Sequence, residues 1–501
     1  MRSPREDDAD ALARHLGTGH HHHGSRSELA PAEKGRRKRS SRALAVVLAL
    51  GLLRAAQVSY ARADETTRAL VHLFYQAPAI LIAAVWLWGA NLFLWRRLRF
   101  DPHPLAVFQL EDARAHLTHA RVWGVARASS LLYLASLAAF LRLANGAARE
   151  EEDWDRVGAT KTPRGLVAAH VVAAATYVAP ALALCAPVDR WYPRTRRLLR
   201  TTIARCLTPW RRPVSFADFF LADVLCSLAK TLSDAERSAC AALAGPAAMF
   251  ARHRDVRFGA CGSTSWHVPL VLALPSAIRL AQCLRQARDG GLLAEALRGE
   301  RAPAAERREG SDAKRAARLN ALKYFSAFPV VLLSHLKYSV SSETWTATVR
   351  PCWVACAAAN TAYSLYWDVT HDWDLRLAPA LARECFGSAG AHGGETSTSA
   401  ENLVDDRDGA KVERSDTALQ RKYLRPRLLY GDPNVYFAAV VANAALRLSW
   451  TYKLSSHLRH NAGTVLAFTA MEITRRFLWS MFRVEKAYLA RWGAGTQGMP
   501  R

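Results

Sequence analysis

The last apolar run of the chain, from Ala462 to Glu485, contains the sequence Met471-Glu472-Ile473-Thr474-Arg475-Arg476-Phe477-Leu478-Trp479. A run of about 20 apolar residues can cross a bilayer as a helix. Charges at that depth are costly, so Glu472, Arg475 and Arg476 are expected to face a bundle interior or a wet cavity. Two adjacent guanidinium groups suit an anion with several oxygens, such as phosphate. Alternatively, the arginines reach lipid head groups and Glu472 is their local partner. This helix alone does not separate the two interpretations.

The composition favours a membrane protein over a nucleic-acid-binding protein. Half of the 501 residues are hydrophobic, and 68 Lys and Arg against 43 Asp and Glu give a formal charge of +25. The apolar residues occur in long blocks, and the basic residues cluster just outside them, which is typical of cytosolic loops in membrane proteins. No nucleic-acid partner is therefore expected.

The apolar blocks predict an all-α, polytopic membrane bundle of about ten transmembrane helices. Basic residues fill alternate connections between the blocks, which predicts that both termini lie in the cytosol. The expected spans are approximately 42–60, 69–95, 121–143, 165–187, 217–245, 264–286, 319–338, 345–368, 434–455 and 461–485.

The remaining segments are predicted to be flexible. Residues 1–41 are polar and basic, and a disordered cytosolic tail is expected there. Within the membrane domain, 42–489, two cytosolic insertions at about 290–316 and 386–420 are rich in Ala, Gly, Ser, Glu and Arg and are expected to be flexible. Residues 490–501 are expected to be a short C-terminal tail.

Neither cofactor nor enzyme chemistry is indicated by sequence motifs. The chain contains no Walker A loop and no G-x-G-x-x-G, H-E-x-x-H or G-x-S-x-G motif. Nine cysteines are scattered without a Cys-x-x-Cys pair, so no disulfide framework and no metal site are predicted. We expect no cofactor, and we expect that the protein is not an enzyme.

Charged residues recur inside other predicted spans. Asp223, Lys230 and Asp234 fall at helical spacings that place them on one face. Asp218, near the start of the same span, is explained by a helix N-terminus. Lys323 is followed by Tyr324 near the start of another span, where contact with lipid head groups is an open alternative.

Two aspartates four residues apart, Asp368 and Asp372, indicate a buried positive partner, because like charges on one helix face repel each other. Arg447, with Trp450 three residues later, is the candidate in the next span. Asn91 adds an uncharged donor, for which a helix-packing hydrogen bond is the alternative. Together the charged residues form a nearly balanced set that predicts a polar conduit. The set consists of Lys323, Arg447, Arg475 and Arg476 with Asp223, Asp368, Asp372 and Glu472.

These motifs, in order from about residue 68 to 489, resemble the EXS domain. This is the membrane domain of the xenotropic and polytropic retrovirus receptor phosphate exporters and of the ERD-type Golgi proteins. The resemblance is carried by Phe216-Ala217-Asp218-Phe219-Phe220-Leu221-Ala222-Asp223, Tyr363-Ser364-x-x-Trp367-Asp368-x-x-x-Asp372-Trp373, Arg447-x-x-Trp450 and Glu472-x-x-Arg475-Arg476-Phe477-x-Trp479.

The resemblance implies phosphate export through the bundle, often by a homodimer. Trp450 and Glu472 would be the gate or its support, to which we add Asp223. The implied phosphate path consists of Asn91, Lys323, Tyr324, Asp368, Asp372, Arg447, Arg475 and Arg476. Only about 40 polar residues precede the first predicted span. This layout is similar to the ERD-type branch without an SPX domain, whose members sit in the Golgi.

The sequence supports two functional hypotheses. The first is a transporter that moves inorganic phosphate through an arginine-lined path in the bilayer, from the Golgi lumen to the cytosol. The alternative is a non-transporting Golgi membrane adaptor that retains or sorts glycosyltransferases through its basic loops. Buried arginines with acidic partners favour the first hypothesis, and a Golgi or other endomembrane is expected rather than the plasma membrane.

Overall fold

The computed structural model describes residues 31–98, 107–108, 112–155, 164–187, 191–245, 261–262, 264–299, 304–377, 422–455, 458 and 461–492. The chain divides into two units, 1–51 and 52–501, and helix α2 (Pro31–Ala61) belongs in part to each. The described residues are helical and include no strand, which confirms the all-α prediction.

The described residues form α-helices and shorter helical turns. The α-helices are α2 (Pro31–Ala61), α3 (Glu65–Arg97), α4 (His119–Asp155), α5 (Arg164–Cys185), α6 (Pro193–Leu207), α7 (Phe216–Ser227), α8 (Ala229–Leu243), α10 (His267–Gly299), α11 (Ala304–Phe325), α12 (Ala327–Leu336), α13 (Ser342–Thr344), α14 (Arg350–Trp367), α17 (Pro433–Arg447) and α19 (Ala462–Trp492). The 3₁₀ segments are η1 (Ala113–Ala115) and η5 (Leu448–Leu454), and the π-helical turns are η2 (Trp345–Val349) and η3 (Asp368–Asp372).

Among the described residues, five helical segments are long and apolar enough to cross a membrane: Ala43–Ala61, Glu65–Arg97, His119–Ala147, Arg164–Cys185 and His267–Gly291. They correspond to the first four predicted spans and to the sixth. The total of about ten spans and the cytosolic position of both termini stay predictions.

Two other predicted spans are each divided into two helices. The span expected at 217–245 is broken at Leu228, between α7 and α8, and the span expected at 319–338 is broken at Ser326, between α11 and α12. The Oγ of Ser326 donates to the carbonyl of Lys323 (2.8 Å), and Nδ2 of Asn360 donates to the Oγ of Ser326 (2.8 Å). Side chains thus satisfy polar groups that the break frees, as a helix in a membrane requires.

The start of α7 confirms the explanation of Asp218 as a helix N-terminus. The Oγ of Ser215 accepts from the backbone N–H of Asp218 (3.2 Å), and the carboxylate of Asp218 accepts from the backbone N–H of Ser215 (3.2 Å). This reciprocal capping box satisfies two donors that the first helical turn leaves open.

The described part of the insertion predicted at 290–316 is helical. Residues 290–299 continue α10 and residues 304–316 belong to α11. A Cβ added at Gly290 would lie 3.3 Å from the backbone nitrogen of Lys314, so the two helices pack closely as a hairpin. The Ala, Glu and Arg content that suggested flexibility is equally favourable for helix.

The predicted tails also differ from the structure. Helix α2 begins at Pro31, inside the segment 1–41 that was expected to be disordered, because proline is well tolerated at the first helical position. Helix α19 continues to Trp492, within the predicted tail 490–501. The insertion predicted at 386–420 lies outside the described residues.

Cys240 and Cys261 form a disulfide, so the prediction of none was wrong. Their Cα atoms are 5.5 Å apart, at the usual spacing for this bond. The two residues are separated by 21 positions, and only the fold brings them together.

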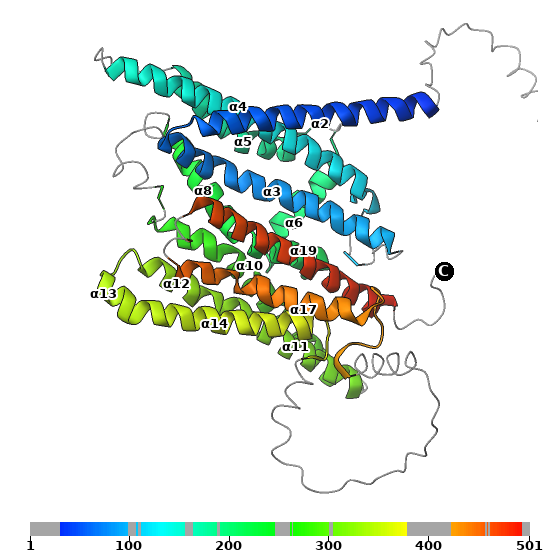
Figure 1. The fold of residues 1–501 in the computed structure, drawn as a ribbon. Coiled ribbons are helices and arrows are strands. Elements are labelled where there is room, and N and C mark those ends of the chain that lie inside the picture. The colour runs from blue at the N-terminus through cyan, green and yellow to red at the C-terminus, as the bar shows by residue number, and fades with distance from the viewer. Residues whose placement is uncertain are drawn as a thin grey trace, which may run out of the picture. The chain divides into compact units, whose positions relative to one another are not determined.

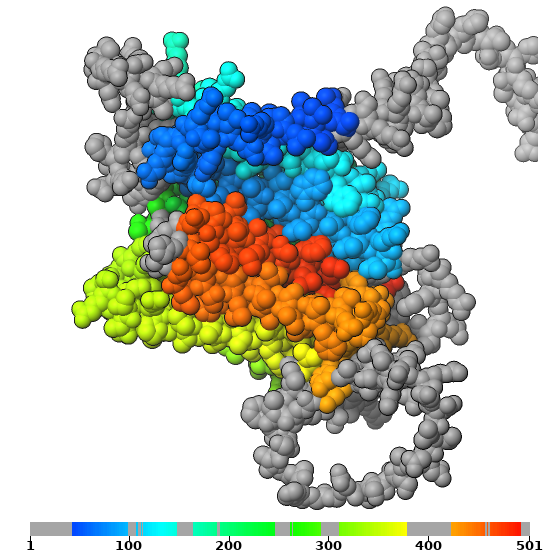
Figure 2. All heavy atoms as spheres, in the orientation of Figure 1, coloured from blue at the N-terminus to red at the C-terminus, as the bar shows by residue number. Residues whose placement is uncertain are grey.

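Helix α19 is central in the second unit. It lies between α3 and α17, and α17 lies in turn against α14 (Figure 1). The same helices run side by side across the face in view in Figure 2, with α3 in blue, α19 in red and α17 in orange. An aromatic core, which includes the fully buried Trp373, Trp479 and Phe482, packs around the second half of α19.

Candidate functional site

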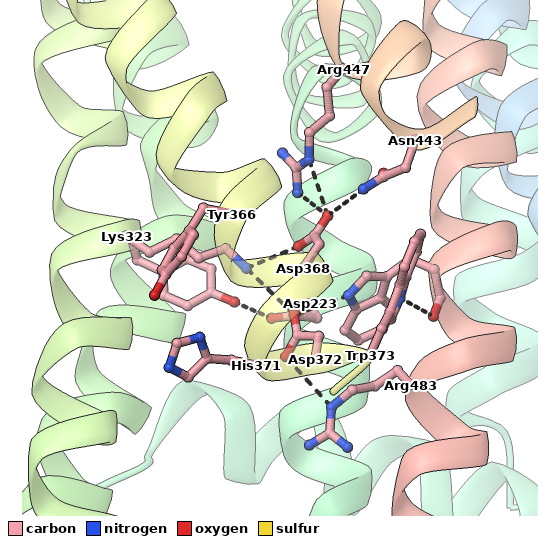
Figure 3. A network of polar contacts seen from close by, with 12 residues as sticks. Asp223, Lys323, Tyr366, Asp368, His371, Asp372, Trp373, Asn443, Arg447 and Arg483 are labelled. Atoms are coloured by element: carbon pink, nitrogen blue, oxygen red, sulfur yellow. Dashed lines mark hydrogen bonds and ion pairs between the residues drawn. The ribbon is translucent and has the colours of Figure 1, made fainter. Parts of the chain in front are cut away.

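The site is built around the π-helical turn that follows α14. The backbone N–H of Trp373 donates to the carbonyl of Asp368 (2.8 Å), five residues earlier. Asp368 and Asp372 are both buried, and their carboxylates point toward side chains from neighbouring helices (Figure 3). Such turns are rare and are frequent at functional sites.

Asp368 has the positive partner that the sequence indicated. One of its oxygens accepts from Nε of Arg447 (3.0 Å) and from Nδ2 of Asn443 (3.1 Å), while Nζ of Lys323 lies 3.4 Å from the other. A guanidinium nitrogen of Arg475 lies 3.5 Å from the same carboxylate. Three cations therefore surround one buried carboxylate.

Asp372 extends the contacts along the bundle. Nζ of Lys323 lies 3.6 Å from its carboxylate, as does Nε of Arg483, and Nε1 of Trp479 donates to it (3.0 Å). Lys323 thus bridges the two aspartates of the π-helical turn (Figure 3).

Asp223, on α7, forms a second centre. It accepts from Nε of Arg279 (2.6 Å), from the hydroxyl of Tyr324 (2.5 Å) and from Nη1 of Arg476 (3.1 Å). The guanidinium of Arg279 is fully buried, 4.6 Å from the ring centre of Phe219 and 4.7 Å from that of Tyr324. Ion pairing and two aromatic faces therefore compensate for its burial.

A residue at the break between α7 and α8 connects the centre around Asp368 with the centre around Asp223. The Oγ of Ser227, the last residue of α7, accepts from Nε of Arg476 (2.8 Å) and from Nη2 of Arg475 (3.3 Å). Glu472 binds Arg475 through both carboxylate oxygens, at 2.6 and 2.8 Å. The two adjacent arginines are thereby held in fixed orientations.

We call the connected residues the charged cluster. Its members are Asp223, Arg279, Lys323, Asp368, Asp372, Arg447, Glu472, Arg475, Arg476 and Arg483. Six are basic and four are acidic, so the cluster has two more positive than negative charges. Forked guanidinium donors with a positive surplus suit a small anion with several oxygens. Within the described ranges, no three His, Cys, Asp or Glu residues gather as metal ligands.

A cavity of about 830 Å³, here called the vestibule, reaches the cluster at Glu472 and Ser227. Its wall includes Lys230, Arg237 and Lys453, and Trp450 stands there edge-to-face with Trp353 (5.6 Å between ring centres). Lys230 forms an ion pair with Asp234 in this wall. Because of the break at Leu228, this pair lines the vestibule whereas Asp223 lies in the cluster, so the single face predicted for all three is not present.

Most of the predicted site residues are brought together. The cluster and its direct contacts contain Asp223, Lys323, Tyr324, Asp368, Asp372, Arg447, Glu472, Arg475 and Arg476. Trp450 lies in the vestibule. Asn91 is not part of the cluster, because its Nδ2 donates to the Oγ of Ser480 (2.5 Å) and it lies in the wall of a different cavity.

Arg279, Arg483, Asn443 and Ser227 were not predicted. Arg279 lies in the middle of the apolar run 264–286, and a charge at that depth is the signal that identified Arg475, so it could have been found in the same way. Arg483 follows Arg476 by seven positions and hence shares its face of α19. Asn443 and Ser227 are neutral and carry no such signal.

The charged cluster is buried at the end of the vestibule, and the surrounding bundle contains apolar helices long enough to cross a membrane. These features define an integral membrane protein with an internal polar site. The family model of the EXS family matches residues 71–489. The chain therefore belongs to the EXS family, as its motifs suggested.

Several curated proteins are similar to the chain over most of its length. "Solute carrier family 53 member 1" of Homo sapiens is 25% identical over 446 residues, which cover 86% of this chain and 52% of that protein. "Xenotropic and polytropic retrovirus receptor 1 homolog" of Danio rerio is 26% identical over 432 residues, 84% of this chain and 50% of that protein. "SPX and EXS domain-containing protein 1" of Dictyostelium discoideum is 24% identical over 421 residues, 83% of this chain and 36% of that protein. The chain thus spans about half the length, or less, of these relatives.

Proposed function

We propose that the protein transports inorganic phosphate across a membrane through the charged cluster. The observation that carries this proposal is the surplus of two positive charges among buried, hydrogen-bonding side chains at the end of the vestibule. Divalent phosphate has the matching charge and can accept forked hydrogen bonds from Arg475 and Arg476. The name of the human relative, a solute carrier, supports transport.

The acidic partners give the path a means of release. Glu472 occupies two donors of Arg475, and Asp223 and Ser227 occupy donors of Arg476. An entering phosphate competes with these groups, and they recapture the arginines when it leaves. The acidic groups thereby keep the affinity for phosphate below the affinity that the arginines alone would have. The site can then bind the anion and still release it.

Entry is from the vestibule, past Trp450, and exit is toward the aromatic core. Beyond Asp372 the cluster is bordered by Trp373 and Trp479, whose contact includes a hydrogen bond from Nε1 of Trp373 to the carbonyl of Trp479 (3.3 Å). In our proposal these rings move to let the anion pass, and Trp450 acts as the gate at the other end.

We infer that the vestibule faces a lumen and that phosphate moves from there to the cytosol. Nε of Arg237, in the vestibule wall, donates to the carbonyl of Cys261 (3.4 Å), so the disulfide lies on the vestibule side. Disulfides persist in oxidising compartments, which supports a lumen on this side. The resemblance to ERD-type proteins supports the Golgi. Homodimer formation and binding of Golgi glycosyltransferases rest on that resemblance alone.

Phosphate flux into proteoliposomes tests the proposal. We expect Arg475→Ala and Arg447→Ala to lower the flux by at least about tenfold, because each removes a donor in the path. Arg194→Ala is the matched control, since Arg194 is half exposed and pairs with Asp112 outside the cluster (3.6 Å). Flux that persists undiminished in both cluster variants would contradict the proposal. It would then favour the adaptor alternative, which requires glycosyltransferase retention to be lost on deletion of 290–316.

A further inference from the structure

A small cavity of about 170 Å³, here called the basic pocket, has three arginines in its wall. Arg205 lies in the last turn of α6, and Arg211 and Arg212 lie in the connection from α6 to α7. Asp218 and Gln282 complete the polar part of the wall. Three arginines against one aspartate leave a surplus of two positive charges around the pocket.

Helix α10 separates the basic pocket from the vestibule. Val268 of this helix lines the vestibule, whereas Gln282 lines the pocket. The two residues are 14 positions apart in a helix long enough to cross a membrane, so they lie about 21 Å apart along its axis. The basic pocket is therefore toward the opposite face of the membrane, where the many arginines of the connection around α6 predict the cytosol.

The inner wall of the pocket is fixed by hydrogen bonds. Nε of Arg205 donates to the carboxylate of Asp218 (2.8 Å). Gln282 is fully buried, and its Nε2 donates to the backbone carbonyl of Asp218 (3.2 Å) while its Oε1 accepts from Arg279 of the charged cluster. Because these groups are already held in place, an occupant meets a preformed wall and little order has to be imposed on binding.

The outer wall offers donors that have no acidic partner. Arg211 and Arg212 are exposed, and within the described part of the chain neither side chain forms an ion pair. The connection that carries them is anchored, because a guanidinium nitrogen of Arg285 on α10 donates to the backbone carbonyl of Trp210. Two adjacent guanidinium groups on an anchored turn suit an anion with several oxygens.

The surroundings of the pocket favour an anion that belongs to the bilayer. Trp191 and Trp210, before and after α6, are 66% and 64% exposed, and Leu207 at the end of this helix is 51% exposed. Exposed tryptophans are typical of the boundary between lipid and water. Anionic lipids are concentrated in the cytosolic leaflet and attract arginines close to its surface.

We propose that the basic pocket binds the phosphate monoester of a lipid head group, as phosphoinositides carry it. A phosphate monoester has nearly two negative charges at neutral pH and three acceptor oxygens, which match the surplus of two charges and the forked donors. The pocket is smaller than the roughly 300 Å³ at which pockets for whole small molecules begin, so the phosphate enters and the acyl chains stay outside, beside Trp210. Phosphatidylcholine has only a phosphodiester with a single negative charge.

Native mass spectrometry of the full chain in detergent tests the binding. Dioctanoyl phosphatidylinositol 4-phosphate should bind saturably, with one high-affinity lipid per chain. Dioctanoyl phosphatidylinositol, which lacks the monoester, should bind at least about tenfold more weakly. Inositol 1,4-bisphosphate, which has the phosphates but no acyl chains, should also bind at least about tenfold more weakly, because it has no apolar contact with Trp210.

A pair of arginine variants locates the site. The double substitution Arg211→Ala and Arg212→Ala should lower the affinity for phosphatidylinositol 4-phosphate at least about tenfold. Arg96→Ala with Arg97→Ala is the matched control. These two adjacent arginines are exposed in the last turn of α3, at the end of that helix away from the vestibule residue His72, and they lie outside the basic pocket. The control should bind like the wild-type chain.

Three results would overturn the proposal. Equal affinity for the lipids with and without the monoester would show that the pocket does not read the phosphate. Equal affinity for inositol 1,4-bisphosphate would assign the pocket to a soluble phosphate instead of a lipid. Equal loss of affinity in both arginine variants would indicate general attraction to a basic surface. The first two comparisons use the wild-type chain, so they require no variant to fold. Phosphate flux is not measured, and a failure here leaves the proposed transport untouched.

Discussion

Asp372 shares Lys323 with Asp368 and faces Arg483 on its other side. Asp372→Asn removes one of the four acidic groups of the cluster and increases its positive surplus. We expect tighter phosphate binding with slower release, so that the half-saturating concentration falls about tenfold and the maximal flux also falls. Proteoliposome flux measured over a phosphate series gives both quantities.

The surface residue Asp112 supplies the control for this prediction. Asp112→Asn also removes a carboxylate that pairs with an arginine, Arg194, but outside the cluster. It should change neither quantity. A higher half-saturating concentration with an unchanged maximal flux in Asp372→Asn would contradict the proposed role of the acidic groups in release.

Single charges inside apolar runs made much of the cluster predictable. Arg475, Arg447 and Asp368 could be identified because a buried charge has few explanations other than a partner or a site. Ser227 and Asn443 could not, because a serine or an asparagine in a helix carries no comparable cost and becomes informative only through its neighbours. The sequence could not predict the contact of Asn91 either, because its hydrogen-bond partner Ser480 lies 389 positions away in the chain.

At the scale of the elements, Gly89 allows α3 and α4 to pack closely. A Cβ at this position would lie 2.4 Å from ring atoms of Trp123. We expect Gly89→Val to destabilise the protein by about 1–3 kcal/mol, because the ring or the helix must shift. Thermal unfolding in detergent is the measurement.

Gly146, on α4, is the control glycine. No atom lies within 4 Å of a Cβ added there, so Gly146→Ala should leave the unfolding temperature unchanged or raise it. Equal unfolding temperatures for wild-type protein and Gly89→Val would show that the helix contact tolerates a side chain.

Helix breaks were the elements that the sequence could not predict. Leu228 and Ser326 each lie inside a segment that was predicted as one continuous span, and neither position carries a proline or glycine that would indicate a break. The breaks depend on contacts made at a distance, such as the hydrogen bond from Asn360 to Ser326. The π-helical turn at Asp368–Asp372 could not be predicted from the sequence for the same reason.

At the scale of the whole molecule, the disulfide gives a test that does not depend on transport. Denatured protein treated with N-ethylmaleimide should gain two more adducts when it is reduced first, because Cys240 and Cys261 are then free. Intact mass spectrometry measures the difference. Cys240→Ser should abolish the difference, and an identical adduct number with and without reduction in the wild-type protein would contradict the bond.

The fold class was predictable at this scale, but the pairing of distant segments was not. Apolar blocks with basic flanks are sufficient to indicate a helical membrane bundle. The hairpin of α10 and α11 requires the close approach of Gly290 to Lys314, which composition does not reveal. Composition alone therefore suggested a flexible insertion where two helices pack.

The positive surplus of the charged cluster has a consequence for the resting protein. In a medium of low dielectric constant, two uncompensated charges attract mobile counter-ions from any solution that reaches them. The vestibule supplies that access, so an empty cluster recruits an anion. In the proposed transport, phosphate therefore enters by exchange, and a tetrahedral divalent ion such as sulfate is a natural competitor. The effective affinity of the protein then depends on the salt composition of its compartment as much as on its own side chains.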